Sequence, residues 1–326
     1  MSKRKPLKAL DLFAGVGGSS SGAMAAGVEV LAAIDYWDLA KKTYQENFPH
    51  VRFLRRKCEN VKLGELRKRI GEVDLIIASP ECTSHTCAKG SAPRSEKSRR
   101  TAFQVVRFAK AFNPRWIVVE NVVHMRSWRK YQSWLQAIHK LGYKTSEQVI
   151  NAADHGVPQA RRRLFILCDR QKTPGKIKPT TKKKRSAASI IDQNGHFNFS
   201  PLRKKNRARA TLGRANRAIR NLGAKTAFLL VYYGSDAAGG WQRTQAPLRT
   251  LTTVDRFGYV RPKKRGHEMR MLQVPEIKAA MGFGEGHRLH HGTRREKVKL
   301  LGNAVCPPVM RDILSQLTNG TAAEKC

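Results

Sequence analysis

The sequence predicts an α/β protein with a doubly wound, largely parallel sheet, followed by a smaller basic unit and a C-terminal segment in which helix signals resume. Up to Asp169, short apolar runs alternate with amphipathic stretches, which is typical of parallel strands covered on both faces by helices. After Asp169 the chain becomes basic, rich in Pro, Thr and Lys, and less periodic. We therefore expect a main domain over residues 1–169, a basic domain over 170–270 and a helical C-terminal segment over 271–326.

Individual elements follow from the spacing of the apolar residues. The strands expected in the first part are Ala9–Phe13, Val28–Ile34, Asp74–Ala78, Trp116–Glu120, a stretch near Lys144–Asn151, and Leu164–Cys168. The helices expected between them are Gly18–Ala26, Asp38–Asn47, Leu63–Arg69, Thr101–Phe112 and Tyr131–Leu141. Further on, we expect a strand at Ala227–Tyr233, a loop at Gly234–Gly240, a strand-like return at Arg249–Thr253, and helices at Val274–Met281 and Ala304–Leu317.

The charge of the chain predicts a polyanionic partner. Its formal net charge is +39, and the segment 170–245 contains 18 Lys and Arg against two acidic residues, with the run Lys182-Lys183-Lys184-Arg185 inside it. Such an excess favours nucleic acid, because phosphate contacts release counterions. The alternative for this run is a disordered basic tract. The six cysteines show no Cys-x-x-Cys spacing, and neither a signal peptide nor a transmembrane segment is recognised, so we expect a soluble, cytoplasmic protein without membrane contact.

The N-terminal strand leads into a glycine-dense turn that has the character of a nucleotide-cofactor loop. Phe13, Gly15 and Gly17 would line this turn, where a close backbone approach and a helix N-terminus favour polar ligand groups. The spacing is not the dinucleotide fingerprint, so a purely structural turn stays an alternative. Asp35, about twenty residues further on, can accept hydrogen bonds from ribose hydroxyls, and Tyr36 can lie on an adenine ring.

Four further motifs follow the turn in a characteristic order. They are Ser79-Pro80-Glu81-Cys82, Glu120-Asn121-Val122, Gln159-Ala160-Arg161-Arg162-Arg163 and Gly302-Asn303-Ala304-Val305. In this order and at these separations, they resemble the motif series of the DNA cytosine-5 methyltransferases. The resemblance runs from Leu10 to about Val309. It implies a Rossmann-like S-adenosylmethionine-dependent methyltransferase domain, with a smaller basic target-recognition domain inserted before the C-terminal helix, so that residues 271–326 would return to the catalytic domain.

The resemblance also implies roles for individual residues. Cys82 would add to C6 of cytosine and Glu120 would hydrogen-bond N3, while Arg161 would contact the base and Arg163 would support it. On the cofactor side, Asp35 and Tyr36 match the acidic and aromatic positions of the family. Asn303 and Val305 would pack beside the glycine turn and shape the methionine pocket.

The catalytic loop departs from the family at one position. Members of the family usually have proline directly before the cysteine, whereas this chain has Glu81 there and proline one place earlier. We expect a variant loop with Cys82 still the nucleophile, and Cys87 is the alternative. A zinc site of Cys82, His85 and Cys87 lacks a fourth ligand, so no metal is expected.

The expected substrate is double-stranded DNA, from which the target cytosine is flipped into the pocket. The loop over 83–99 has the composition of a lid, and the basic insert would choose the sequence. We expect the protein to act on DNA as a monomer. Two alternatives stay open: an RNA cytosine-5 methyltransferase acting on transfer RNA, and a catalytically inactive nucleic-acid-binding protein on the same scaffold.

Overall fold

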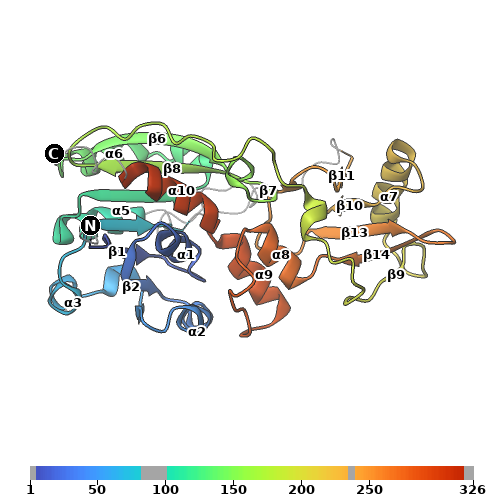
Figure 1. The fold of residues 1–326 in the computed structure, drawn as a ribbon, viewed down its shortest axis with the longest axis horizontal. Coiled ribbons are helices and arrows are strands. Elements are labelled where there is room, and N and C mark those ends of the chain that lie inside the picture. Colours follow the sequence, from blue (N-terminus) through green and yellow to red (C-terminus); the bar gives the residue numbers. More distant parts are fainter. Residues whose placement is uncertain (1–4, 82–100, 234–238, 319–326) are drawn as a thin grey trace.

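Two sheets of unequal size organise the chain (Figure 1). The structure is a computed structural model that describes residues 5–81, 101–233 and 239–318. The large sheet and its helices form one end of the elongated molecule, and the small sheet forms the other. Strands β7 (Gln159–Ala160) and β12 (Leu248–Arg249) pair in parallel between them.

The large sheet has seven strands in the order β3-β2-β1-β4-β5-β8-β6. Their bounds are β1 (Lys8–Leu12), β2 (Glu29–Asp35), β3 (Arg52–Arg55), β4 (Leu75–Ala78), β5 (Trp116–Asn121), β6 (Lys144–Asn151) and β8 (Arg162–Asp169). The first five in this order are parallel, and β8 is antiparallel to both of its neighbours, β5 and β6. The predicted α/β fold is confirmed, and each of the six predicted strands is present. Strand β3 was not predicted.

Helices cover both faces of this sheet. They are α1 (Gly18–Ala25), α2 (Asp38–Asn47), α3 (Leu63–Ile70), α5 (Ala102–Phe112), α6 (Tyr131–His139) and α10 (Pro307–Thr318). Side chains alternate along each strand, so Ile77 packs in the cluster with α1, α2 and α10, whereas Ile76 packs with α3, α5 and α6. The last helix therefore returns to the first fold, and it begins at Pro307 rather than at the predicted Ala304.

The small sheet is antiparallel, with the order β11-β10-β13-β14-β9. Its strands are β9 (Ser200–Pro201), β10 (Phe228–Val231), β11 (Trp241–Arg243), β13 (Phe257–Pro262) and β14 (His267–Met271). Helix α7 (Arg209–Leu222) packs on one face through Ala215 and Ala218. The other face, including Leu229 and Tyr259, joins the core of the large unit. The predicted strand at Arg249–Thr253 is wrong beyond Arg249, because Arg249 ends β12.

Two helices lie between the small sheet and α10, namely α8 (Val274–Ala280) and α9 (Arg294–Asn303). A buried ion pair joins β14 to α8, because both terminal nitrogens of Arg270 lie 2.7 Å from the carboxylate oxygens of Glu276. The short 3-10 helices are η1 (Cys58–Asn60), η3 (Val123–Ser127), η4 (Ala152–His155) and η5 (Ala187–Ile190). Within the described ranges, none of the helices has the length and apolar character required to cross a membrane.

Candidate active site

The glycine turn between β1 and α1 has an unusual backbone. Phe13, Gly15 and Gly17 all have positive φ angles, of 62°, 53° and 83°. Such angles are uncommon for a residue with a Cβ, so Phe13 is held by its surroundings. A Cβ on Gly17 would lie 2.3 Å from the Phe48 ring, and one on Gly18 would lie 2.1 Å from the Val305 carbonyl oxygen. The turn therefore requires glycine where it meets α2 and the segment before α10.

Asp35 ends β2 directly beside this turn. Its carboxylate accepts hydrogen bonds from the main-chain nitrogens of Gly15, at 3.0 Å, and Trp37, at 2.9 Å. Burial raises the pKa of Asp35, and the backbone donors oppose this. Each oxygen can accept a further bond. Tyr36 is 52% exposed, so its ring is available to a flat ligand next to the carboxylate. The structure brings together Phe13, Gly15, Gly17, Asp35 and Tyr36, as the sequence predicted for the cofactor end.

Asp11 and Cys58 also belong to this region, and the sequence analysis did not single them out. The Asp11 side chain is completely buried, and its Oδ2 accepts a hydrogen bond from Ser20 Oγ at 2.6 Å. Ser20 Oγ lies 2.6 Å from the Tyr44 hydroxyl. Burial raises the pKa of Asp11 to about 7. Burial also raises the pKa of the Cys58 thiol, which is next to the Phe13 backbone. The available signal for Asp11 was a carboxylate inside an otherwise apolar strand.

The two ends of the predicted catalytic loop are held at the same edge of the sheet. Asn121 Nδ2 donates to the Pro80 carbonyl at 3.1 Å, and the Glu81 main-chain nitrogen donates to Thr101 Oγ1 at 3.2 Å. The chain therefore enters and leaves the segment 82–100 at neighbouring points. Cys82, its rival Cys87 and the 83–99 loop lie outside the described residues.

Glu120 lies next to the start of this loop. Strand β4 pairs with β5 up to Ala78 and Val119, so the residues that follow, including Glu120, lie beside Ser79. Glu120 is buried, and Arg163 Nε lies 3.2 Å from its Oε1. Burial raises the pKa of Glu120, while the charges of Arg163 and Arg161 oppose that effect. A buried carboxyl with a raised pKa can supply a hydrogen-bond donor.

Arg161 and Arg163 point to the same region, but their contacts differ. Arg161 is buried and donates to the carbonyl oxygens of Leu251 at 3.0 Å, Gly302 at 2.8 Å and Ala304 at 3.2 Å. It joins β8 to the segment after β12 and to the end of α9. Both arginines and Glu120 line a cavity of about 10 Å³, which is enough for about one water molecule. Arg161 is thus held by main-chain oxygens, whereas Arg163 lies beside Glu120.

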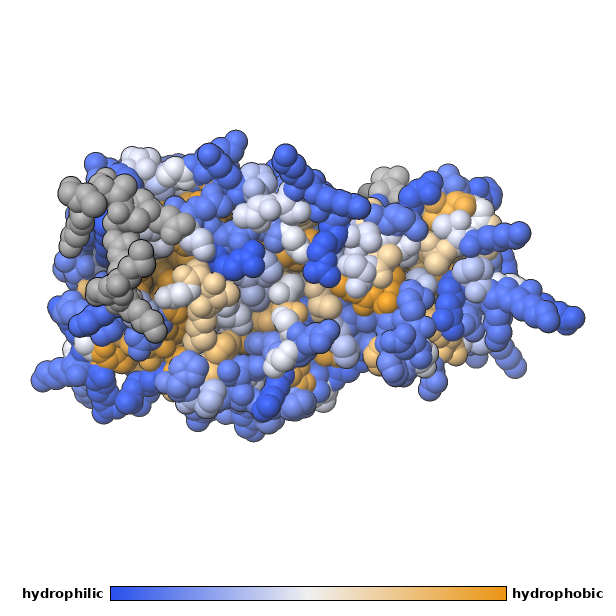
Figure 2. All heavy atoms as spheres, viewed as in Figure 1, coloured by the Kyte–Doolittle hydropathy of each residue, from blue (hydrophilic) through white to orange (hydrophobic). Residues whose placement is uncertain are grey.

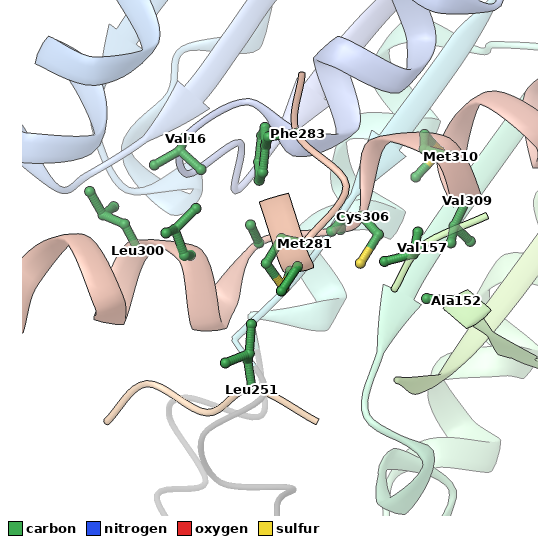
Figure 3. Packing of buried hydrophobic residues seen from close by; sticks show 14 of the residues in the cluster. Val16, Ala152, Val157, Leu251, Met281, Phe283, Leu300, Cys306, Val309 and Met310 are labelled. Carbon is green, nitrogen blue, oxygen red and sulfur yellow. The ribbon is translucent and has the colours of Figure 1, made fainter. Parts of the chain in front are cut away.

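The motif from Gly302 to Val305 packs against the glycine turn, opposite the strands that carry Glu120 and Arg163. Val305 is buried with its carbonyl against Gly18, whereas Asn303 is exposed at the end of α9. Figure 3 shows the packing that surrounds this junction, with Val16 facing Phe283 and Leu300, and Cys306 near Val157. The described parts of the chain contain no group of three or more His, Cys, Asp or Glu side chains placed to hold a metal ion.

Comparison with known proteins agrees with this arrangement. The profile of the C-5 cytosine-specific DNA methylase family matches residues 7–319. The Type II methyltransferase M.HgiDI of Herpetosiphon aurantiacus is 33% identical over 169 residues, which are 49% of this chain and 52% of that protein. The human tRNA (cytosine(38)-C(5))-methyltransferase is 26% identical over 174 residues, which are 52% of this chain and 44% of that protein. The aligned part therefore spans about half the length of these relatives.

The solved structures show the same fold. The methyltransferase EhMeth of Entamoeba histolytica superposes with a TM-score of 0.71 at 16% identity, over 98% of this chain and 99% of that one.

Proposed function

The chain belongs to the C-5 cytosine-specific DNA methylase family, and from this premise we propose that it transfers a methyl group from S-adenosylmethionine to C5 of cytosine in a specific sequence of duplex DNA. The observation that carries the proposal is the ion pair between the buried Glu120 and the partly buried Arg163, next to Pro80 where the Cys82 loop begins. It lies on the same edge of the sheet as the glycine turn and Asp35. In open α/β sheets, ligands bind at this edge.

The residues at the cofactor end fit S-adenosylmethionine. The turn at Gly15 and Gly17 allows a close backbone approach, the Asp35 carboxylate has capacity for ribose hydroxyls, and the exposed Tyr36 ring can cover adenine. When bound, the cofactor supplies an electrophilic methyl group. Val305 would form the wall of the methionine pocket next to Gly18, and Asn303 stays a predicted contact.

The chain's own residues would activate the base in two ways. The Cys82 thiolate would bond to C6, and the electrons of the C5–C6 double bond would make C5 nucleophilic. Glu120 would donate from its protonated carboxyl to N3, which favours this addition, and Arg163 would bind the base oxygen O2. After C5 has taken the methyl group, a water or loop base removes the C5 proton and the thiolate leaves C6.

The basic residues 170–270 are proposed as the target-recognition domain, and the molecule as a monomer on DNA. The name of the M.HgiDI relative favours a Type II modification enzyme of a restriction-modification system. The name of the human relative keeps transfer RNA as an alternative substrate. A non-catalytic nucleic-acid-binding role is the remaining alternative.

The test is a covalent trap. Duplex DNA containing 5-fluorocytosine, incubated with the protein and S-adenosylmethionine, should give a denaturation-resistant protein–DNA adduct, because fluorine at C5 prevents release of the cysteine. Cys82→Ser should abolish the adduct and methyl transfer, and the matched Cys87→Ser should retain both. A Cys82→Ser protein that still methylates would refute the mechanism. An adduct with transfer RNA alone would establish the RNA alternative, and intact cofactor binding without transfer would establish the non-catalytic one.

A further inference from the structure

The segment between the two sheets is a fixed strap, defined here as residues 170–192. It runs along β6 and α10 toward the small sheet (Figure 1). Its first half is held by paired side-chain bonds to the main chain. Gln148 accepts from Ile177 N and donates to the Gly175 carbonyl, both at 2.8 Å. Gln316 of α10 accepts from Lys178 N at 2.8 Å and donates to the Lys178 carbonyl at 3.0 Å.

The second half of the strap is attached at η4 and at the turn that follows β11. The main-chain nitrogens of Thr180 and Thr181 donate to the Asp154 carbonyl, at 3.1 and 3.3 Å. Further along, Ala187 and Ala188 donate to the carbonyls of Ala246 and Thr244, both at 2.8 Å. The basic run between these attachments is therefore not a disordered tract, which was the alternative left open by the sequence.

The position of η4 places this run next to the candidate active site. Strand β6 ends at Asn151, which pairs with Arg162, and the next residue, Ala152, lines the cavity of Glu120 and Arg163. Asp154 lies two residues further on. The strap thus passes the end of the sheet where the target base would bind, on the flank formed by β6.

The side chains of the run are exposed and largely uncommitted. Lys182, Lys183 and Arg185 are all exposed, and among the described residues only their neighbour Lys184 has an ion pair within the run, at 3.1 Å from Asp154. Lys183 and Arg185 line a hollow of about 420 Å³ with Ser186, Ser189 and Gln245. Figure 2 shows hydrophilic side chains projecting along this edge of the molecule. No acidic residue occurs between Arg170 and Asp192.

We propose that Lys182, Lys183 and Arg185 form a phosphate-contacting surface for the duplex that flanks the target cytosine. A fixed backbone presents three cations without the entropic cost of ordering a loose tail, and a hydroxyl such as that of Ser186 commonly binds phosphate oxygens. These contacts would anchor the duplex without reading its sequence, whereas the small sheet and α7 would supply the sequence choice. The inference rests on the proposed DNA substrate.

The test is the salt dependence of DNA binding by the full chain. Fluorescence anisotropy would measure the dissociation constant for a duplex of about 25 base pairs at several salt concentrations. The triple variant Lys182→Gln, Lys183→Gln, Arg185→Gln should reduce the slope of log K against log salt by about 2.7, because each phosphate contact contributes about 0.9. The control Lys62→Gln, Lys68→Gln, Arg69→Gln removes the same charges from exposed positions at α3 and should leave the slope nearly unchanged.

Two further measurements separate the possible outcomes. At saturating DNA the strap variant should keep the kcat of wild type and its affinity for S-adenosylmethionine, while the KM for DNA rises. An unchanged slope with methylation intact would overturn the strap surface and leave the proposed function standing. A reduced slope in a protein that methylates no DNA would uphold the surface and refute the function. A reduced slope for transfer RNA but not for duplex DNA would overturn the choice of partner.

Discussion

Replacement of Asp11 by asparagine tests whether the cofactor end contains a carboxyl that the fold keeps protonated. The side chain is completely buried, and within the described residues its Oδ1 has no hydrogen-bond partner. Burial is the main reason that the pKa of Asp11 rises from 3.8 to about 7; the Ser20 hydroxyl opposes this shift and Asp35 adds to it. Asparagine has the same shape, and its amide oxygen can still accept the Ser20 hydrogen bond.

The sign of the effect follows from proton linkage. Between pH 3.8 and about 7 the folded protein retains a proton that the unfolded chain loses, so stability falls as pH rises. The slope is about 1.4 kcal/mol per pH unit. Between pH 5 and pH 8 this slope acts over about two pH units, from pH 5 to the folded pKa of about 7. Over that range the free energy of unfolding of the wild type should fall by about 2.7 kcal/mol because of Asp11. The asparagine side chain has no proton to lose, so the stability of Asp11→Asn relative to wild type should rise by about 2.7 kcal/mol between pH 5 and pH 8.

The assay is urea unfolding followed by tryptophan fluorescence at pH 5 and pH 8. Taking the difference between variant and wild type at each pH cancels the contributions of all other titrating groups. Glu72→Gln is the matched control, because the Glu72 side chain is 81% exposed, and its difference from wild type should be the same at both pH values. If the Asp11→Asn difference is equally constant, the folded protein does not hold that proton and the reasoning is refuted.

Two further substitutions test the catalytic edge and the junction behind it. Glu120→Gln should lower methyl transfer by about 10²- to 10⁴-fold without changing cofactor binding. Because burial raises the pKa of Glu120, wild-type activity should fall as the pH rises through the pKa of Glu120. A single-turnover pH profile of the variant with the same falling limb would contradict the role of Glu120 as an acid. Gly18→Ala places a Cβ 2.1 Å from a main-chain oxygen of Val305 that cannot swing aside, and should cost about 1 to 3 kcal/mol in urea unfolding. The control Gly64→Ala, with no atom within 4 Å of its new Cβ, should gain about 0.5 to 1 kcal/mol, and equal effects at both positions would rule out the close packing.

The strands of the large sheet could be predicted because each buried strand has a local apolar pattern. Strand β3 escaped prediction since it lies at the sheet edge, where two of its four residues, Arg52 and Arg55, are exposed arginines. Helix α7 escaped for a related reason. Its fully buried side chains are small, Thr211, Ala215 and Ala218, and its larger apolar side chains are only partly buried among the arginines. The antiparallel direction of β8 has no local signature, because direction depends on the path of the connection.

The site could be predicted as a set of positions, but not as a set of contacts. The motif resemblance implied that Arg161 and Arg163 serve the same base, and both line the cavity of Glu120. The partners of Arg161, however, are main-chain oxygens 90 to 143 residues further along the chain, at Leu251, Gly302 and Ala304. Any residue has a carbonyl there, so no sequence pattern identifies them. Contacts of this kind become visible only in the fold, and they distinguish the surroundings of Arg161 from those of Arg163, which lies beside Glu120.

The presence of Glu81 where the family usually has proline has a physical explanation in the contacts at the start of the loop. The Glu81 main-chain nitrogen donates to Thr101 Oγ1 at 3.2 Å, across the two ends of the segment that contains Cys82. Proline has no N–H, so the residue usual in the family could not make this bond. The proline one place earlier is still fixed, because Asn121 binds the Pro80 carbonyl at 3.1 Å. The exchange therefore replaces a stiff residue with a hydrogen bond. Burial is the main reason that the pKa of Asp35 and of Tyr36 is raised, and the negative charge of Glu81 adds to both shifts. The variant loop thus ties its own two ends together through the main chain and places a negative charge near Asp35 and Tyr36 at the predicted cofactor site.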